Sequence, residues 1–404
     1  MKALLFERSV PRLASARIAG AISPGLGSRF GALRLVDTDE PPLPGPGWER
    51  IRPLLSGICG SDLSTVDGHA SRWFEPLVSF PFVPGHEVVG LREDGSRVVL
   101  EPVLGCDARG VAPPCRACAQ SDVGRCTNIT FGHIRPGLQT GYCSDTGGGW
   151  GTALVAHSSQ LHAVPDALSD EAAVMVEPTA CAIHGSLAAG DLSGAVVAVL
   201  GAGTLGLCTV AALRRYSLPA QLIIGAKYPE QRALAGELGA TTVVAPNELR
   251  RAVRRATRSL VVDDRLTGGA DVVIDCVGTA ASVAEALSVV RPQGRIVLVG
   301  MPGEISLDLT PLWQREIQLA GAYAYGAEST LGRRTFDLAL ELVHDAGLHR
   351  LVSARYPLER FTDAIDHAAN AGSRGAVKVA FDLRSAGRRG RAAGLSTIQE
   401  GTVR

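Results

Sequence analysis

The stretch Val196-Val197-Ala198-Val199-Leu200-Gly201-Ala202-Gly203-Thr204-Leu205-Gly206 joins five apolar residues directly to a turn that holds three glycines. Such an apolar run is typical of a buried strand. Glycines at this spacing let the backbone turn tightly and approach a pyrophosphate, whose charge is stabilised by the N-terminus of the following helix. The alternative is a tight turn without a ligand. We predict a dinucleotide site, with these cofactor-binding residues: Gly201, Gly203, Thr204, Leu205 and Gly206.

Apolar strands and helical stretches alternate after this turn. The strand candidates cover residues 196–200, 221–225, 242–245, 271–276 and 294–300, and the helical stretches cover 204–215, 230–238, 249–260 and 281–290. This βαβ pattern predicts a doubly wound parallel sheet of the Rossmann type. We expect the dinucleotide-binding domain to span residues 169–326.

The flanking segments have a different texture. Residues 1–168 are rich in short β-like runs, glycine and proline, which predicts a β-rich, partly barrel-like domain. Within them we interpret the segment from Arg8 to Leu35 as a long loop. Residues 327–383 begin with an expected helix from Thr330 to Asp345 and end in a strand that returns to the first domain. Residues 384–404 have the composition of a disordered tail.

Composition limits the classes of partner. Lys+Arg and Asp+Glu both number 40, so the charge gives no support for nucleic-acid binding. No apolar run approaches the ~18 residues of a membrane span, and the N-terminus lacks the features of a signal peptide. We therefore expect a cytoplasmic protein without a membrane partner. We interpret Arg250, Arg251, Arg254, Arg255 and Arg258, which recur at helical spacing, as a solvated face.

Nine cysteines without an export signal favour thiol and metal chemistry over disulfides. Cys59 lies between glycines, His86 follows Pro84-Gly85, and Glu177 lies among apolar residues before a helical stretch. Singly, they fit a core thiol, a satisfied histidine and a helix-cap acid. Together, thiolate, imidazole and carboxylate suit a catalytic zinc with an open fourth position.

A second cysteine set suits a structural zinc. It consists of Cys106, Cys115, Cys118 and Cys126. The alternative is free thiols in a loop.

The end of the second Rossmann strand indicates the nicotinamide cofactor. An NAD site usually places an acid there to bind the ribose 2′-hydroxyl. This chain has Ala226 and Lys227, which remove the repulsion that a 2′-phosphate would meet and add a positive charge. We favour NADP(H) over NAD(H). The alternative is a solvated Lys227 and a site that accepts NAD(H).

These motifs together resemble the zinc-dependent alcohol dehydrogenases of the medium-chain dehydrogenase/reductase superfamily, over about residues 1–383. The matching segments are GICGSD at 57–62, PGHE at 84–87, the cysteine run at 106–126, VEPTACAIHG at 176–185, VLGAGTLG at 199–206, DVVIDCVG at 271–278 and GRIVLVG at 294–300. The resemblance implies a GroES-like catalytic domain beside the Rossmann domain. The glutamate ligand is similar to that of the polyol, threonine and glucose dehydrogenase branch.

By this resemblance, Cys59, His86 and Glu177 bind the catalytic zinc, and Glu87 lies close behind the metal. Ser61 starts a proton relay, and Asp62 orients His86. The family also implies a homo-oligomer, a dimer or tetramer. Two features depart from it: eight residues separate Cys106 from Cys115, and Ser64 stands where some relatives have a relay histidine.

The function implied is hydride transfer between a secondary alcohol or polyol, or the matching ketone or aldehyde, and NADP(H). One alternative is a zinc-free quinone or enoyl-type reductase of the same superfamily, which would not need the three zinc-binding side chains. Another is a non-catalytic protein that binds zinc and nucleotide and has no use for Ser61.

Overall fold

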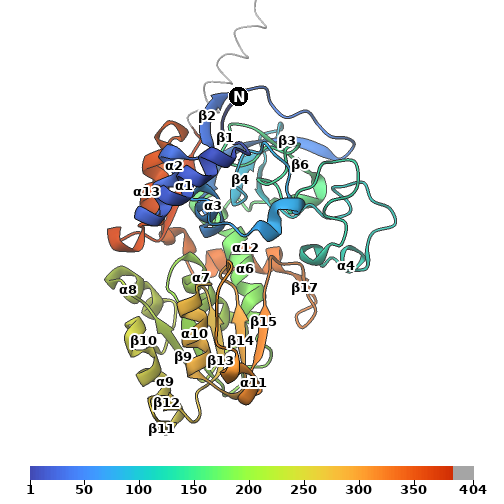
Figure 1. The fold of residues 1–404 in the computed structure, drawn as a ribbon. Helices are drawn as coiled ribbons and strands as arrows, with labels where there is room; N and C mark the ends of the chain where they lie inside the picture. The colour runs from blue at the N-terminus through green and yellow to red at the C-terminus, as the bar shows by residue number, and fades with distance from the viewer. Residues whose placement is uncertain (385–404) are drawn as a thin grey trace, which may run out of the picture.

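The computed structural model describes residues 1–384 of the 404-residue chain. Both ends of the described chain form a β-rich part, and the middle of the chain forms an α/β part (Figure 1). Of the tail expected over residues 384–404, all but Arg384 lies outside the described residues. In the described part of the chain, no helix has the length and apolar character needed to cross a membrane.

The α/β part is built on a six-stranded sheet in which every neighbouring pair is parallel. The strand order is β10-β9-β8-β13-β14-β15. The strands are β8 (Val196–Leu200), β9 (Gln221–Gly225), β10 (Thr242–Val244), β13 (Ala270–Asp275), β14 (Val290–Leu298) and β15 (Gln318–Gly321). The chain winds outward in both directions from β8, so the topological switch point lies between β8 and β13. This confirms the predicted doubly wound parallel sheet.

Helices cover the two faces of this sheet (Figure 1). They are α7 (Thr204–Tyr216), α8 (Pro229–Glu237), α9 (Leu249–Thr257), α10 (Ala280–Val289) and α11 (Thr310–Gln314). The expected helix over residues 249–260 was too long, because Arg258 adopts a left-handed conformation with a φ of 53° and ends α9 at Thr257. A hairpin of β11 (Val261–Val262) and β12 (Arg265–Leu266) follows. Val197, Ala198 and Val199 are fully buried because helices pack on both sides of β8.

The β-rich part contains a seven-stranded sheet and a separate antiparallel pair. The sheet order is β18-β19-β3-β4-β5-β7, and β6 also pairs with β3. The pair is β1 (Lys2–Phe6) with β2 (Leu33–Asp37). The sheet strands are β3 (Trp48–Gly57), β4 (Val88–Leu91), β5 (Arg97–Leu100), β6 (Leu154–His157), β7 (Leu161–Ala163), β18 (Val352–Tyr356) and β19 (Lys378–Asp382). Its short helices are α3 (Gly60–Val66), α4 (Arg116–Ala119) and α5 (Asp170–Ala173).

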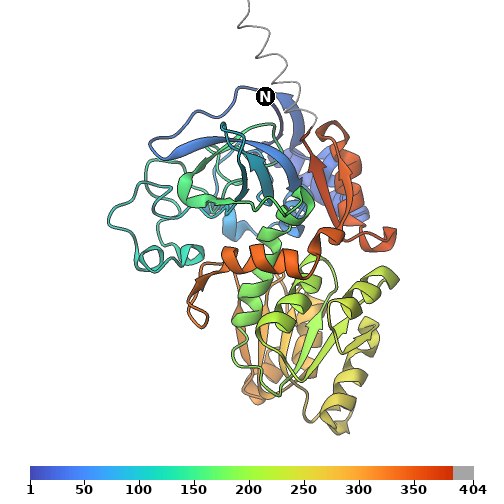
Figure 2. The same cartoon turned by 180° about the vertical axis from the view of Figure 1, so that it is seen from behind.

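Two helices lie at the junction of the two parts. The helix α6 (Val176–Leu187) contacts both α7 and α12 (Thr335–Asp345). Figure 2 shows α12 crossing this junction, with the rest of the C-terminal segment leading back to the β-rich part. The expected start of this helix at Thr330 was wrong, because a hairpin of β16 (Ala327–Glu328) and β17 (Arg333–Arg334) occupies its first residues.

The interpretation of the segment from Arg8 to Leu35 as a loop was also wrong. It holds α1 (Val10–Ile22) and α2 (Gly27–Phe30) before β2 begins. The Pro-Gly turn at its centre is short, and the alanine-rich stretch before it has high helix propensity. The helix α2 packs against α13 (Phe361–Ala369), so this segment joins the two ends of the chain.

Asp67 fixes the turn between α1 and α2. Its carboxylate accepts the backbone N–H groups of Gly25 at 2.8 Å and Gly27 at 3.0 Å. The side chain is buried, with 6% of the residue exposed. Buried hydrogen bonds to a charged group are strong, and the backbone groups left behind would have no solvent to replace them.

We therefore expect Asp67→Ala to lower the free energy of unfolding by about 2 kcal/mol. Urea denaturation measures this, and limited proteolysis should cut within residues 8–35 faster. Asp39→Ala, at an exposed position, is the matched control. Equal stability and equal cleavage in the two variants would contradict this role for Asp67.

Candidate active site

Three potential metal ligands meet at the edge of the β-rich part. One ligand atom each from Cys59, His86 and Glu87 lies within 4.8 Å of the other two. Cys59 stands between β3 and α3, while His86 and Glu87 directly precede β4. Because β3 and β4 are antiparallel neighbours, the end of one strand and the start of the other lie at the same edge. Thiolate, imidazole and carboxylate form a donor set that suits zinc.

A glycine makes this close approach possible. A Cβ atom at Gly57 would stand 1.8 Å from Glu87 Oε2 and 2.8 Å from Lys378 Cε. Any other residue at the end of β3 would push both side chains away. The sequence identified this glycine only as a neighbour of Cys59.

The imidazole of His86 lies beside the carboxylate of Asp62. Its Nδ1 lies 3.5 Å from Asp62 Oδ1 and, although buried, makes no hydrogen bond within the described residues. Asp62 in turn accepts the Cys59 N–H at 3.0 Å and the Tyr142 hydroxyl at 3.2 Å. The orienting role of Asp62 stays a prediction, and the Asp62 carboxylate is the charged group that lies beside this buried ring nitrogen.

Glu177 lies beside the compact group but is not among its three members. It occupies the first turn of α6 and is buried, with 7% exposed. Its Oε1 accepts the Tyr325 hydroxyl at 3.2 Å and the Cys181 thiol at 3.5 Å. Burial raises the pKa of Glu177 to about 7, and the charges of His86, Glu87 and Lys378 also act on it. The structure therefore places the carboxylates of both Glu87 and Glu177 at the site, whereas the sequence analysis expected Glu177 as the carboxylate ligand.

Lys378 is a site residue that the sequence analysis missed. It begins β19, is 2% exposed, and pairs with the Glu87 carboxylate. Its Nζ also donates to the Ile58 carbonyl at 3.1 Å. Burial would lower the pKa of Lys378, but the charge of Glu87 outweighs it and raises that pKa. In the sequence, the one local indication that Lys378 has a special role is its position in an otherwise apolar strand.

The side chains around Ser61 form the surroundings of the expected proton relay. Ser61 lies in the first turn of α3, and its carbonyl accepts the Thr65 hydroxyl at 2.9 Å. The hydroxyls of Thr65 and Tyr142 are 3.5 Å apart. Ser64, at the position of the absent histidine, accepts the His69 N–H through its backbone at 2.7 Å. Thr65 therefore links the backbone of Ser61 to the hydroxyl of Tyr142.

The four remaining cysteines predicted to bind metal form a second compact group. Cys106, Cys115, Cys118 and Cys126 each place a sulfur within 4.8 Å of the others. Backbone N–H groups point at the sulfurs, as from Cys115 to Cys106 at 3.3 Å and from Asn128 to Cys126 at 3.3 Å. All nine cysteines of the chain are free thiols in the structure.

The longer spacing after Cys106 is accommodated by a buried arginine. Arg109 is fully buried, and its guanidinium donates to the carbonyls of five residues: Leu104, Phe131, Ile134, Arg135 and Gly137. It thereby holds the inserted residues against the loop that follows Cys126. Cys106, the cysteine with the unusual spacing, lies in the group with the other three.

The glycine turn has the geometry that a dinucleotide site needs. It links β8 to α7, and Gly201 has a φ of +88° that favours glycine. A Cβ at Gly206 would stand 1.9 Å from the Gly201 carbonyl oxygen, whereas a Cβ at Gly203 would meet nothing within 4 Å. The turn lies at the carboxyl end of β8, beside the switch point of the sheet.

A second cation lies where the cofactor's ribose is expected. Ala226 is fully buried after β9, and Lys227 is exposed, with its Nζ 5.4 Å from the centroid of the Tyr228 ring. Arg232 of α8 donates to the carbonyls of Ala226 at 2.9 Å and Lys227 at 3.1 Å. The sequence analysis did not identify Arg232, whose helical position gave no indication of this contact.

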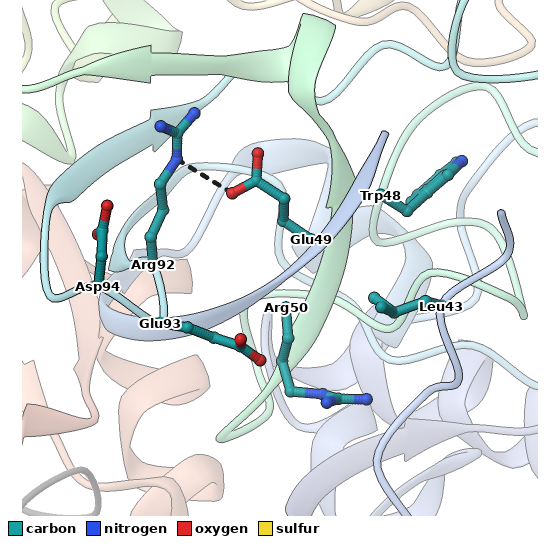
Figure 3. Close-up of a pocket in the computed structure, with 7 residues that line it drawn as sticks. All are labelled: Leu43, Trp48, Glu49, Arg50, Arg92, Glu93 and Asp94. Atoms are coloured by element: carbon teal, nitrogen blue, oxygen red, sulfur yellow. Dashed lines mark ion pairs between the residues drawn. The ribbon is translucent and has the colours of Figure 1, made fainter. Parts of the chain in front are cut away.

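A surface pocket of about 300 Å³ lies apart from these residues and includes none of them (Figure 3). Two of its charged side chains pair with neighbours, Arg92 with Glu49 at 3.3 Å and Arg50 with Glu40 at 2.9 Å. Asp94 accepts hydrogen bonds from the N–H and hydroxyl groups of Ser96.

Comparison with known proteins agrees with both halves of the fold. The alcohol dehydrogenase GroES-like domain family matches residues 45–166, and the zinc-binding dehydrogenase family matches residues 204–345. The chain belongs to the zinc-dependent alcohol dehydrogenase family of the medium-chain dehydrogenase/reductases. It is therefore an oxidoreductase.

Relatives of this dehydrogenase match most of its length. It is 28% identical to L-idonate 5-dehydrogenase of Vitis vinifera, covering 84% of this chain and 89% of the relative. It is 27% identical to sorbitol dehydrogenase of Bacillus subtilis, covering 79% and 85%. A solved putative zinc-binding dehydrogenase of Sinorhizobium meliloti, bound to NADP, is 25% identical with a TM-score of 0.65, covering 87% of this chain and 95% of that chain.

The cysteine group leads to a prediction about metal content. We expect Cys115→Ser to remove one zinc ion per chain and to lower the midpoint of thermal unfolding, because a structural zinc contributes folding free energy. Elemental analysis and calorimetry measure the two effects. Cys143→Ser, a buried thiol outside the group, should keep the wild-type metal content. Equal zinc content in both variants would contradict the assignment.

The contact between Tyr142 and Asp62 leads to a second prediction. Tyr142→Phe removes the hydroxyl that holds Asp62, so we expect zinc affinity at the Cys59 group to weaken by roughly 10-fold. Competition with a chelator measures it. Tyr356→Phe is the control, because that hydroxyl contacts His367 Nδ1 at 2.9 Å in another part of the β-rich domain. Unchanged affinity in Tyr142→Phe would contradict this role.

Proposed function

We propose that this dehydrogenase transfers hydride between a secondary alcohol or polyol, or the matching carbonyl compound, and NADP(H). The observation that carries the proposal is the compact group of Cys59, His86 and Glu87. The polyol and idonate dehydrogenases among the relatives support the substrate class. We further propose a small-molecule substrate, a cytoplasmic location and a homo-oligomeric state, which rest on the family resemblance.

The residues present fit a catalytic zinc. In our proposal Cys59 and His86 hold it together with a carboxylate, and Glu87 is that carboxylate because it belongs to the compact group. Glu177, the ligand expected from the sequence, is the second carboxylate at the site and is held by Tyr325 and Cys181. When bound, zinc would polarise the substrate oxygen and stabilise the alkoxide form of the alcohol.

The chain's own groups then position and move the proton. Ser61 accepts the proton of the substrate hydroxyl and releases its own, and the hydroxyl of Thr65, which donates to the Ser61 carbonyl, is a neighbouring group. Asp62 keeps His86 in one orientation, and Lys378 restrains the Glu87 carboxylate. The turn at Gly201, Gly203 and Gly206 binds the pyrophosphate of the cofactor, whose nicotinamide supplies the hydride chemistry.

Two matched variants test the metal site. We expect Glu87→Gln to lose one zinc ion and NADPH-linked carbonyl reduction, whereas Glu177→Gln keeps both zinc ions and loses roughly 10-fold in activity. Elemental analysis, together with assays over a panel of polyols and secondary alcohols, measures these effects. A Glu87→Gln variant with full metal content would contradict the ligand set. A folded, metal-free wild type that reduces activated double bonds would establish the zinc-free reductase instead.

Cofactor preference has its own test. We propose that Lys227 contacts the 2′-phosphate and that Ala226 leaves room for it, as the NADP-bound relative supports. Loss of a charged hydrogen bond should raise the KM for NADPH in Lys227→Ala by about 10-fold. The KM for NADH serves as the internal control and should not change. Equal effects on both cofactors would assign Lys227 a general role and leave NADP(H) preference without support.

A further inference from the structure

The outer face of α9 carries a stripe of unpaired arginines. Leu249 and Val253 are fully buried against the sheet. On the opposite side the helix and its C-cap expose residues spaced three and four apart: Arg251, Arg254, Arg255 and Arg258. Across residues 1–384, no ion pair joins any of these four to a carboxylate. Like charges at this spacing repel one another, so the isolated stripe destabilises its own helix.

The hairpin that follows α9 exposes aliphatic side chains beside this stripe. Leu260, Val261 and Val262 are 71%, 41% and 64% exposed. The strands turn through Asp263 and Asp264, which both have positive φ, as in a two-residue hairpin turn. The hairpin thus exposes Leu260, Val261 and Val262 to solvent, while Leu266 on its second strand is buried.

An ion pair joins the hairpin to the helix. Arg250 Nη1 donates to the Asp264 carboxylate and to its carbonyl, both at 2.6 Å. This contact neutralises one of the two acids at the hairpin tip. Over residues 248–265, six arginines face three carboxylates, so the surface keeps a net positive charge within a chain of zero formal charge.

We propose that this surface, formed by Arg251, Arg254, Arg255, Arg258 and residues 260–262, binds the anionic headgroups of a lipid bilayer. We call it the arginine–hairpin face. Guanidinium groups match the geometry of phosphate, and neighbouring aliphatic side chains gain free energy by entering the interfacial layer. This inference does not depend on the proposed reaction.

The composition of the face favours lipid over nucleic acid. Single-stranded nucleic acids are bound by basic grooves with aromatic platforms, and residues 248–267 contain no Phe, Tyr or Trp. The sequence alone indicated a solvated face and no membrane partner, because it showed the arginines without the exposed hairpin. A peripheral contact needs no membrane span.

The position of the face is compatible with catalysis. In Figure 1, α9, β11 and β12 lie at the end of the α/β part that is farthest from the β-rich part. The metal ligands and the glycine turn lie toward the other end. A bilayer on the arginine–hairpin face would therefore leave access to the proposed active site open.

Vesicle co-sedimentation of the full-length protein tests the proposal. We expect binding to phosphatidylcholine vesicles that contain phosphatidylglycerol, no binding to pure phosphatidylcholine, and weaker binding at high salt. Reversing three charges in the triple variant R251E/R254E/R255E should weaken binding by at least about 100-fold. V261S/V262S should weaken it less and leave the salt dependence unchanged.

The control is R17E/R29E/R72E, which reverses three exposed arginines of the β-rich part and should bind like the wild type. Thermal unfolding and NADPH binding show that each variant is folded. The proposal is wrong if wild type ignores the anionic vesicles or if the control loses binding equally. If the wild type binds single-stranded RNA and does not bind vesicles, the ligand of this face is nucleic acid and the lipid proposal is wrong. If the wild type does not bind vesicles and V261S/V262S forms a smaller oligomer than the wild type, the face is a contact between copies of this chain.

Discussion

The pairing of Glu87 with Lys378 is the constraint on which the rest of the site depends. Both side chains are almost fully buried, and an unpaired charge in that position would cost several kcal/mol. The pair forms only if β19 lies beside β3, with Ala380 opposite Gly57. The last strand of the described chain is thereby fixed to the loop that carries Cys59. Gly57 has to be glycine for the same reason, since a side chain there would occupy the place of the pair.

The two cysteine-containing groups are stabilised in different ways. The four-cysteine group is closed: backbone N–H groups reach its sulfurs, and Arg109 ties the surrounding loop through carbonyl contacts. The group at Cys59 is surrounded by groups that titrate or carry charge, including Asp62, Glu177 and Lys378. Four cysteine sulfurs with no open position suit a structural zinc ion. A site surrounded by charged and titratable side chains suits a reaction in which protons are transferred.

Local sequence patterns predicted the α/β part well because its signals are short in range. The strand at 196–200, the glycine turn and the alternation that follows depend on neighbouring residues, and β8 begins and ends where the pattern indicated. The metal-binding residues were found through motifs such as PGHE at 84–87. The sequence analysis missed Lys378, Tyr142 and Tyr325. These residues reach the site through tertiary contacts, and no sequence motif around them indicates those contacts. The helices at 10–30 were missed because Pro24-Gly25 obscured the alanine-rich stretch before it.

The pairing of β19 with β3 also determines which part of the molecule can complete its fold first during synthesis. A ribosome releases the chain from its N-terminus, and domains generally fold as units when their residues are available. The six strands of the parallel sheet are all complete by Gly321, so this sheet can form at that point, and α12 adds to the core on one of its faces soon afterwards. The β-rich part contains strands β1 to β7, which are made before the parallel sheet, yet β3 lacks its partner β19 until residues 378–382 have left the ribosome. The half of the molecule that is synthesised first is therefore the half that is finished last.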